Sequence, residues 1–453
     1  MPDVKLFPAD RQRFWLLLPL SMYLLLSGLY MWAVPVGEAP DEPGHMRCIE
    51  QVAIENRLPQ MVSTTDESID WWLRENLLSD YMCYHMPAYY LLSGQIVRSI
   101  STVTGISPHF EYPPILADYA GEGPLFIHPP RESFGQLQQP LTLISLRILS
   151  ILLGLTVLGS TFVVARRLFP EQLFIAVLAV TLIAGWPQFL FISRGITNDV
   201  LATAVAALIL ALLTNIGNPK RFFWLALLSS LALLTKLTVA FTVGIVLLVW
   251  LLEWIVYADK RRQYGQMLLI IGGVWLATGL LMRLNPTIWA NLQFSFSDFT
   301  GGASGSTSPA YWQQVYLWTI RSGWAWFGWL SVAAPLAHAM VWWFSLEITA
   351  ILGIYGILKR PLSPQTKLLL LTLAAWAAAI LVSYIQVTAN RWQPQFRFAL
   401  AVLPVLTTLS AAGVLNWFRQ RPRLQTGIVL AFAVLLMGYN LWLITAVVLP
   451  AYA

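Results

Sequence analysis

The sequence predicts an all-α fold, a polytopic bundle of membrane-spanning helices. Hydrophobic residues make up 57% of its 453 residues and charged residues only 11%, whereas roughly 25% of the residues in a soluble globular domain are charged. Apolar stretches of about 20 residues, the length that crosses a bilayer, recur along the chain. Basic clusters separate many of these stretches. Together these features exclude a disordered chain, a coiled coil and an ordinary soluble enzyme.

Eleven apolar stretches are candidate spans. They are 14–34, 140–164, 172–192, 200–216, 222–235, 237–257, 266–284, 332–357, 366–387, 398–417 and 425–449. The first follows a basic segment, as a signal peptide would, but no cleavage site follows it, which indicates an uncleaved anchor. The stretch 222–257 has two interpretations, one long helix or a hairpin of two short ones.

Basic clusters at alternate junctions predict the orientation of the spans. They are Arg166-Arg167, Lys220-Arg221, Lys260-Arg261-Arg262, Lys359-Arg360 and Arg419 with Arg421 and Arg423. Because cytoplasmic loops are enriched in Lys and Arg, we expect a multi-pass protein of the plasma (inner) membrane with its N-terminus in the cytoplasm and its C-terminus outside. The cations form no stripe interleaved with aromatic residues, so nucleic-acid binding is not expected.

Two long loops, 36–139 and 285–331, are expected on the extracytoplasmic side of a single transmembrane domain, 1–453. Amphipathic helices are expected in the first loop. It contains both cysteines, Cys48 and Cys83, on the side where disulfides form. A bond between them would add roughly 3–4 kcal/mol in the chain-entropy model. Two separate buried thiols are the alternative.

The strongest local motif is Ala39-Pro40-Asp41-Glu42-Pro43-Gly44-His45, directly after the first span. Two adjacent carboxylates at a membrane exit are costly unless they are solvated or used. Asp41 before Glu42-Pro43 is also a good helix start, and an amphipathic interfacial helix is expected to follow. The simpler interpretation is a capped interfacial helix without chemistry.

Further polar motifs fall on the same predicted face. They are Tyr84–Tyr90, Arg194–Asp199, Thr235-Lys236, Arg321–Trp329 and Asn390–Arg397. An arginine at the end of a span usually extends to the lipid headgroups, so each motif alone is weak evidence. Cations at this depth suit a phosphate headgroup, and acids beside them suit activation of a nucleophile. The combination is what transfer from a lipid phosphate to an acceptor requires.

These motifs, in this order, resemble the GT-C superfamily of integral-membrane glycosyltransferases, and most closely a poorly characterised family of polytopic membrane proteins with a DEPxH motif. The matching segments are Asp41–His45, His85–Tyr90, Asn198-Asp199, Thr235-Lys236, Ser322–Trp329 and Gln395–Pro404. The sequence departs from the family pattern at Gly323, Phe396 and Phe398, which affects fine substrate contacts rather than the fold.

The resemblance implies an inverting transfer of a sugar from a polyprenyl-phosphate-linked donor to a glycan, lipid or protein acceptor at the outer face. Asp41 would be the general base on the acceptor hydroxyl. Glu42 would support it, or would bind a divalent metal together with Asp41 and His45. The remaining roles implied are donor-phosphate binding by Arg391, Arg397, Lys236, Arg194 and Arg321, and substrate contact by His85, Tyr89, Asn198, Asp199, Trp324 and Trp326.

A flippase or carrier of lipid-linked sugars, without transferase activity, is the alternative function. Transporters commonly show inverted repeats and acids at mid-membrane depth. No repeat is evident, and Glu347 is the acid that the predicted spans place in mid-membrane. The spacing of the acidic motif is not a zinc signature, so the need for a metal stays open.

Overall fold

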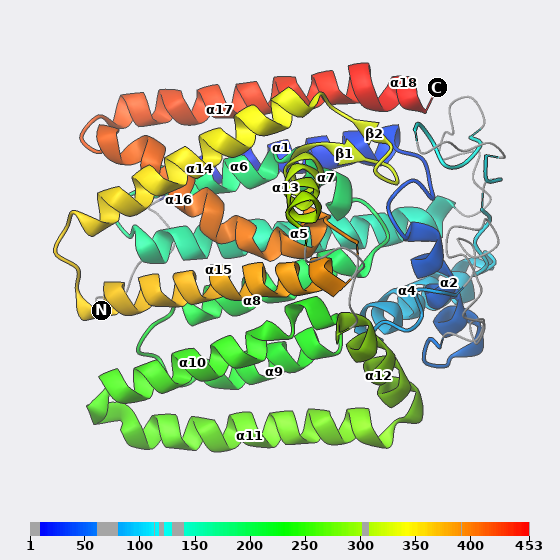
Figure 1. Ribbon diagram of the computed structural model, residues 1–453, viewed down its shortest axis with the longest axis horizontal. Helices are drawn as coiled ribbons and strands as arrows, with labels where there is room; N and C mark the ends of the chain where they lie inside the picture. The colour runs from blue at the N-terminus through cyan, green and yellow to red at the C-terminus, as the bar shows by residue number, and fades with distance from the viewer. Residues whose placement is uncertain are drawn as a thin grey trace.

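The computed structural model describes residues 10–60, 80–112, 114–116, 122–128, 140–300, 308–390 and 392–452. Long helices dominate it and run side by side across Figure 1. The bundle contains α1 (Asp10–Ala33), α5 (Pro140–Leu168), α6 (Leu173–Ala184), α8 (Asn198–Leu213), α9 (Arg221–Leu233), α10 (Phe241–Val256), α11 (Arg261–Leu284), α14 (Leu336–Leu358), α15 (Pro364–Asn390), α16 (Leu403–Leu415) and α17 (Pro422–Leu443), with two short helices, α7 (Pro187–Ser193) and α18 (Leu449–Ala451).

The helices of the predicted outer loops pack against this bundle but differ from its helices in position or direction. α2 (Glu42–Glu55), α4 (Ala88–Thr104) and α12 (Pro286–Thr300) lie at one end of it (Figure 1). α13 (Pro309–Trp324) is seen end-on in Figure 1, so it crosses the direction of the long helices. The turns from α10 to α11, α14 to α15 and α16 to α17 carry basic clusters and lie at the opposite end. The long loops and the basic turns therefore occupy opposite ends of the molecule.

The chain is a multi-pass membrane protein, but the predicted count of eleven spans is not confirmed. Eight described helical segments are long and apolar enough to cross a membrane, and the bent pair α6–α7 makes up to nine. A helix lies within each predicted span, yet α8 and α9 have only 16 and 13 residues. At 1.5 Å per residue, a helix of that length falls short of the hydrocarbon core of about 30 Å.

The stretch 222–257 forms two helices rather than one. α9 ends at Leu233, a 3₁₀ turn (η2, Leu237–Val239) follows, and α10 begins at Phe241. The two helices pack against each other as a hairpin. Lys236 lies in the break with an extended backbone (φ −163°, ψ 135°), so the interruption places a cation where the two helices meet.

α6 and α7 meet at a bend of 65°. Pro187 begins α7 and Gly185 ends α6, and a Cβ at Gly185 would lie 2.7 Å from the Cβ of Leu436. The bend frees the Gly185 carbonyl, which accepts a hydrogen bond from Asn440 Nδ2 of α17 over 2.9 Å. The Tyr30 hydroxyl of α1 donates to Asn440 Oδ1 over 3.0 Å. One buried amide thus joins three helices.

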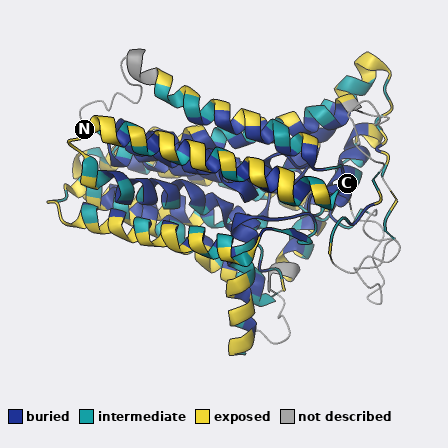
Figure 2. Ribbon diagram, turned by 90° about the horizontal axis from the view of Figure 1, so that it is seen from above, coloured by how far each residue is buried: buried dark blue, intermediate teal, exposed yellow. Residues whose placement is uncertain are grey.

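Exposed apolar residues cover the outside of the bundle, as a membrane protein requires (Figure 2). Leu269 on α11 and Val434 on α17 are 78% and 71% exposed. Inside, α14 and α16 approach closely because each carries a glycine at the crossing: a Cβ at Gly353 would lie 2.1 Å from the Leu409 carbonyl oxygen. The described strands are short, β1 (Trp326–Phe327) pairing antiparallel with β2 (Val332–Ala333). The predicted all-α membrane fold therefore holds, apart from this small hairpin.

Candidate functional site

The acidic motif forms a tight turn between α1 and α2, at the end of the bundle that carries the long loops. Glu42 holds this turn together: its carboxylate accepts hydrogen bonds from the backbone N–H groups of Gly37 (2.9 Å), Ala39 (3.4 Å) and Ile196 (3.1 Å). The Arg147 guanidinium lies 3.7 Å from it. Glu42 is fully buried. Its contacts hold the turn that carries Asp41, which agrees with a supporting position for Glu42.

Asp41 is the partly exposed carboxylate of this turn. Its backbone is left-handed (φ 64°), a conformation rare for residues other than glycine and often found at functional sites. Its Oδ2 lies 2.6 Å from Arg397 Nη2, and its Oδ1 accepts a hydrogen bond from the Tyr81 hydroxyl over 3.1 Å. Burial is the largest single influence and would raise the pKa of Asp41, but Arg397 and the other basic groups around it together outweigh burial, and the pKa is lowered. Asp41 is therefore ionised at neutral pH.

A chain of ion pairs leads inward from Asp41. Arg397 Nη1 lies 3.6 Å from Asp199 Oδ2, and Lys236 Nζ lies 2.6 Å from Asp199 Oδ1. Lys236 also donates to Asn198 Oδ1 over 3.1 Å. We call Asp41, Arg397, Asp199 and Lys236 the charge network. The side chain of Asp41 is 20% exposed and the other three are at most 6% exposed, so Asp41 is the member that an incoming molecule meets first.

Four separate elements bring the charge network together. Asp41 precedes α2, and Arg397 lies in the first turn of the 3₁₀ segment η4 (Phe396–Val402). Asp199 lies in the first turn of α8, where the Thr197 hydroxyl accepts a hydrogen bond from its N–H, and acids are favoured at that end of a helix. Lys236 lies in the break between α9 and α10. Each member of the network therefore lies at or directly before the beginning of a helical element.

His45 lies one helical turn after Asp41, among tyrosines. Its Nδ1 is 2.9 Å from the Tyr90 hydroxyl, and its Nε2 is 3.4 Å from the Thr197 hydroxyl. Burial lowers the pKa of His45 to about 3, so the imidazole is neutral. Tyr89, expected to contact substrate, is fully buried with its ring edge-on to His45. The protein encloses both side chains, so neither is exposed at the site.

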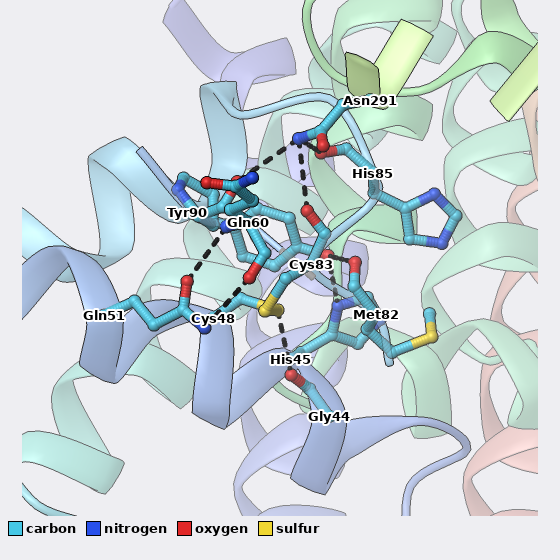
Figure 3. The surroundings of a disulfide bond; sticks show 11 residues. Gly44, His45, Cys48, Gln51, Gln60, Met82, Cys83, His85, Tyr90 and Asn291 are labelled. Carbon is cyan, nitrogen blue, oxygen red and sulfur yellow. Dashed lines mark hydrogen bonds between the residues drawn. A yellow bond between two sulfur atoms is a disulfide. The ribbon is translucent and has the colours of Figure 1, made fainter. Parts of the chain in front are cut away.

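Cys48 and Cys83 form a disulfide that ties α2 to the segment 80–87. This segment carries Tyr81 and His85. Figure 3 shows the His85 imidazole pointing away from the sulfur atoms. Asn291 of α12 braces the segment, since its Nδ2 lies 3.1 Å from the Cys83 carbonyl and 3.3 Å from the His85 carbonyl. The half-buried His85 is thereby fixed next to His45, with ring centroids 6.3 Å apart.

The predicted phosphate-binding cations do not all converge. Arg397 and Lys236 lie together in the charge network. Arg194 is fully buried against the Phe191 ring, 4.6 Å from its centroid, and Arg321 lies over Trp326 at 4.6 Å. Arg391 lies outside the described residues. The sequence places all of these cations near one end of the bundle, but it does not determine which way each helix turns its side chains.

The two tryptophans expected to contact substrate are packed inside the protein. Trp324 stacks on Trp342 with centroids 4.7 Å apart, and Trp326 meets Trp318 edge to face at 4.8 Å. Their exposed fractions are 1% and 7%. The expectation that these rings offer open faces to a sugar or a prenyl chain therefore needs correction, because other aromatic rings already cover them.

The three residues considered as metal ligands do not point at one position. Asp41 faces Arg397, Glu42 binds backbone N–H groups, and His45 faces Tyr90. In the part of the chain that the structure describes, no three His, Cys, Asp or Glu side chains are grouped to hold a metal ion. These residues therefore do not fit a metal in this arrangement.

Two further residues of the site, Tyr81 and Arg147, belong to none of the sequence motifs described above. Tyr81 donates to Asp41, and no sequence pattern marks it. Arg147 is buried on α5 and its guanidinium donates to the carbonyls of Met31 (3.1 Å) and Pro35 (3.2 Å), beside Glu42. The sequence feature that marks Arg147 is its position inside the predicted span 140–164, where charged residues are rare and usually functional or paired.

Comparisons with known proteins show the fold. No family model matches the sequence, and no curated protein matches it. The structure is similar to that of ArnT from Cupriavidus metallidurans bound to undecaprenyl phosphate, with a TM-score of 0.52 and 15% identity, covering 97% of this chain and 74% of that chain. The apo state of the same protein gives 0.52 and 14% identity, covering 98% and 74%. The fold is GT-C-like.

An oligosaccharyltransferase from Archaeoglobus fulgidus, solved with Zn and sulfate, is more distant, with a TM-score of 0.47, 11% identity and coverage of 92% of this chain and 53% of that chain. The comparisons bear out the resemblance to GT-C proteins at the level of the fold. They do not confirm membership of the DEPxH-motif family.

Proposed function

We propose that the protein is a membrane glycosyltransferase that moves a sugar from a polyprenyl-phosphate-linked donor to an acceptor at the end of the bundle that carries the long loops. The observation that carries this proposal is the charge network: a partly exposed carboxylate, Asp41, held 2.6 Å from Arg397, with Lys236 in the same chain of ion pairs. A base for the acceptor and cations for the phosphate thus lie side by side.

Each member of the network has a role in such a transfer. Asp41 takes the proton from the acceptor hydroxyl as its oxygen forms a bond to the anomeric carbon. The bond from that carbon to the phosphate oxygen breaks, and the phosphate leaves with the bonding electrons. Arg397 and Lys236 stabilise the charge that grows on the leaving phosphate. A single displacement of this kind inverts the configuration at the anomeric carbon.

Asp41 and Asp199 also hold Arg397 and Lys236 in place when no donor is bound. Asp199 lies between Lys236 and Arg397 and contacts both. Cations held in place before the reaction need little reorganisation when charge develops, which is why preorganised groups contribute most to catalysis. The choice of a polyprenyl phosphate as the donor's lipid is supported by the similar structure of ArnT, which is bound to undecaprenyl phosphate. No step of this mechanism is assigned to a metal.

Native mass spectrometry of protein in mild detergent tests the phosphate site, with undecaprenyl phosphate as the probe. Arg397→Gln should lower the bound fraction about tenfold or more, as expected for loss of a charged contact to phosphate. Arg419→Gln is the matched control, because Arg419 pairs with Glu171 on an exposed surface in the turn from α16 to α17, at the opposite end of the bundle (Figure 1). Equal binding by both variants would contradict the proposed site. Binding without turnover of any polyprenyl-phosphate sugar would favour the carrier instead.

A further inference from the structure

A carboxylate lies on the lipid-facing side of a span, at mid-membrane depth. Glu347 lies in the middle of α14, eleven residues from Leu336 at one end and eleven residues from Leu358 at the other. At 1.5 Å per residue it lies about 16–17 Å from either end of the helix. That distance is too long for its side chain to reach the headgroups. Glu347 is exposed.

The surroundings of Glu347 on the helix surface are apolar. Phe344, Ile348 and Ile351 share its face at helical spacing and are 40%, 58% and 64% exposed. α14 passes the length and hydropathy test for a membrane span. A charged side chain in mid-span is costly, so such residues are rare outside sites of function or pairing.

No partner for Glu347 exists within the described chain. None of the described residues gives its carboxylate a hydrogen bond or an ion pair. A second copy would not supply one either: on the described spans, every exposed Lys or Arg lies near a helix end, and the buried cations Arg147, Lys236 and Arg397 are enclosed. Two copies meeting at this face would place like charges together.

We propose that the face of α14 around Glu347 docks a transmembrane helix of a different membrane protein, one that carries a Lys or Arg in the middle of its span. The cation pairs with Glu347, and Phe344, Ile348 and Ile351 pack against the partner helix. In lipid an interhelical pair of this kind satisfies both charges, whereas each would otherwise face hydrocarbon.

This inference is independent of the proposed transfer reaction, because Glu347 makes no contact with the charge network. The inward face of α14 carries Trp343, Leu346 and Ala350, and the Trp343 Nε1 donates to the Ile320 carbonyl over 2.8 Å. Glu347 lies at the border of that buried face, so the docking face lies beside it and is accessible within the membrane plane.

Photo-cross-linking of the full chain in membranes of its own host tests the proposal. Benzoylphenylalanine replaces Phe344, and the control replaces Val434, which is also exposed on the outside of the bundle but lies on α17. An adduct with one other protein is expected at 344 and none at 434. Mass spectrometry then shows whether that protein has a span with a basic residue at its centre.

A charge exchange makes the test specific. Glu347→Lys should reduce the adduct about tenfold or more, the scale of breaking a desolvated charge pair, and the reverse change of the partner's basic residue to Glu should restore it. Glu347→Leu covers the case in which the lysine variant does not insert, because leucine suits lipid, and it should also lose the adduct. Adducts with lipid alone, an adduct of two copies of this chain, or a partner adduct indifferent to both variants would each overturn the proposal.

Discussion

Arg397 donates to the carboxylate of Asp41 over 2.6 Å although 356 residues separate them in the chain. The pair joins the turn after the first span to the beginning of η4, and it places the proposed phosphate-binding cation beside the proposed general base. Each of its two members has a second contact, Tyr81 for Asp41 and Asp199 for Arg397. The geometry of the site therefore depends on both partners at once.

Asp41→Asn should reduce sugar transfer about 10²- to 10⁴-fold, the usual contribution of a general base. Asparagine tolerates the left-handed backbone at this position almost as well as aspartate, so the change removes the charge and keeps the turn. Binding of undecaprenyl phosphate should persist. The measurement is turnover beside native mass spectrometry, and full activity of the asparagine variant would exclude Asp41 as the base.

Lys236→Met should destabilise the protein by about 3–5 kcal/mol, because it leaves the buried Asp199 without its closest cation. The double variant Lys236→Met/Asp199→Asn should be less destabilised than the sum of the two single changes. Unfolding in detergent, followed for all four proteins, gives the coupling. Strict additivity would mean that the ion pair contributes nothing to stability.

Stability should fall as the pH drops from about 6.5 towards 3. The folded state holds His45 neutral with a pKa of about 3, below its ordinary value of 6.5. Between these values the unfolded chain binds a proton that the folded chain does not, so stability rises with pH there, by up to about 1.4 kcal/mol per pH unit for one proton. His45→Gln should flatten this slope, and an unchanged slope would place the proton uptake elsewhere.

Reduction of the Cys48–Cys83 disulfide should lower stability by roughly 3–4 kcal/mol. Transfer should weaken as well, since Tyr81 and His85 lie on the segment that the bond holds against α2. Thermal unfolding with and without a membrane-permeant reductant measures the first effect. The variant Cys48→Ala/Cys83→Ala serves as the control and should not respond to the reductant, because these are the two cysteines of the chain.

Much of the fold was predictable because apolar length and basic junctions are strong signals. The acidic turn, Lys236 and the Asn198-Asp199 pair were also marked, since each interrupts an apolar stretch, and the structure brings Asp41, Asp199, Lys236 and Arg397 together. What the sequence left undetermined was the direction of side chains on helices that are apolar all round. Arg194, at the end of α7, and Arg321, in the last turn of α13, contact the rings of Phe191 and Trp326.

The number of spans was unpredictable for a related reason. Hydropathy measures how apolar a stretch is, and not whether the helix within it is continuous. α8 and α9 are apolar but short, and α6 bends into α7. Two members of the charge network lie at such places, Asp199 at the beginning of the short α8 and Lys236 after the short α9. The local failures of the pattern and part of the candidate site therefore coincide.

The amide of Asn440 has a consequence for how the protein is made. The Gly185 carbonyl at the α6–α7 bend and the Tyr30 hydroxyl of α1 both bind the Asn440 side chain. Asn440 follows Gly185 by 255 residues, so the ribosome adds it much later. Until α17 enters the bilayer, that carbonyl has to find water or a temporary partner, since unpaired backbone groups are costly in lipid. Early helices should therefore stay loosely assembled, or held by an insertion chaperone, until synthesis reaches α17.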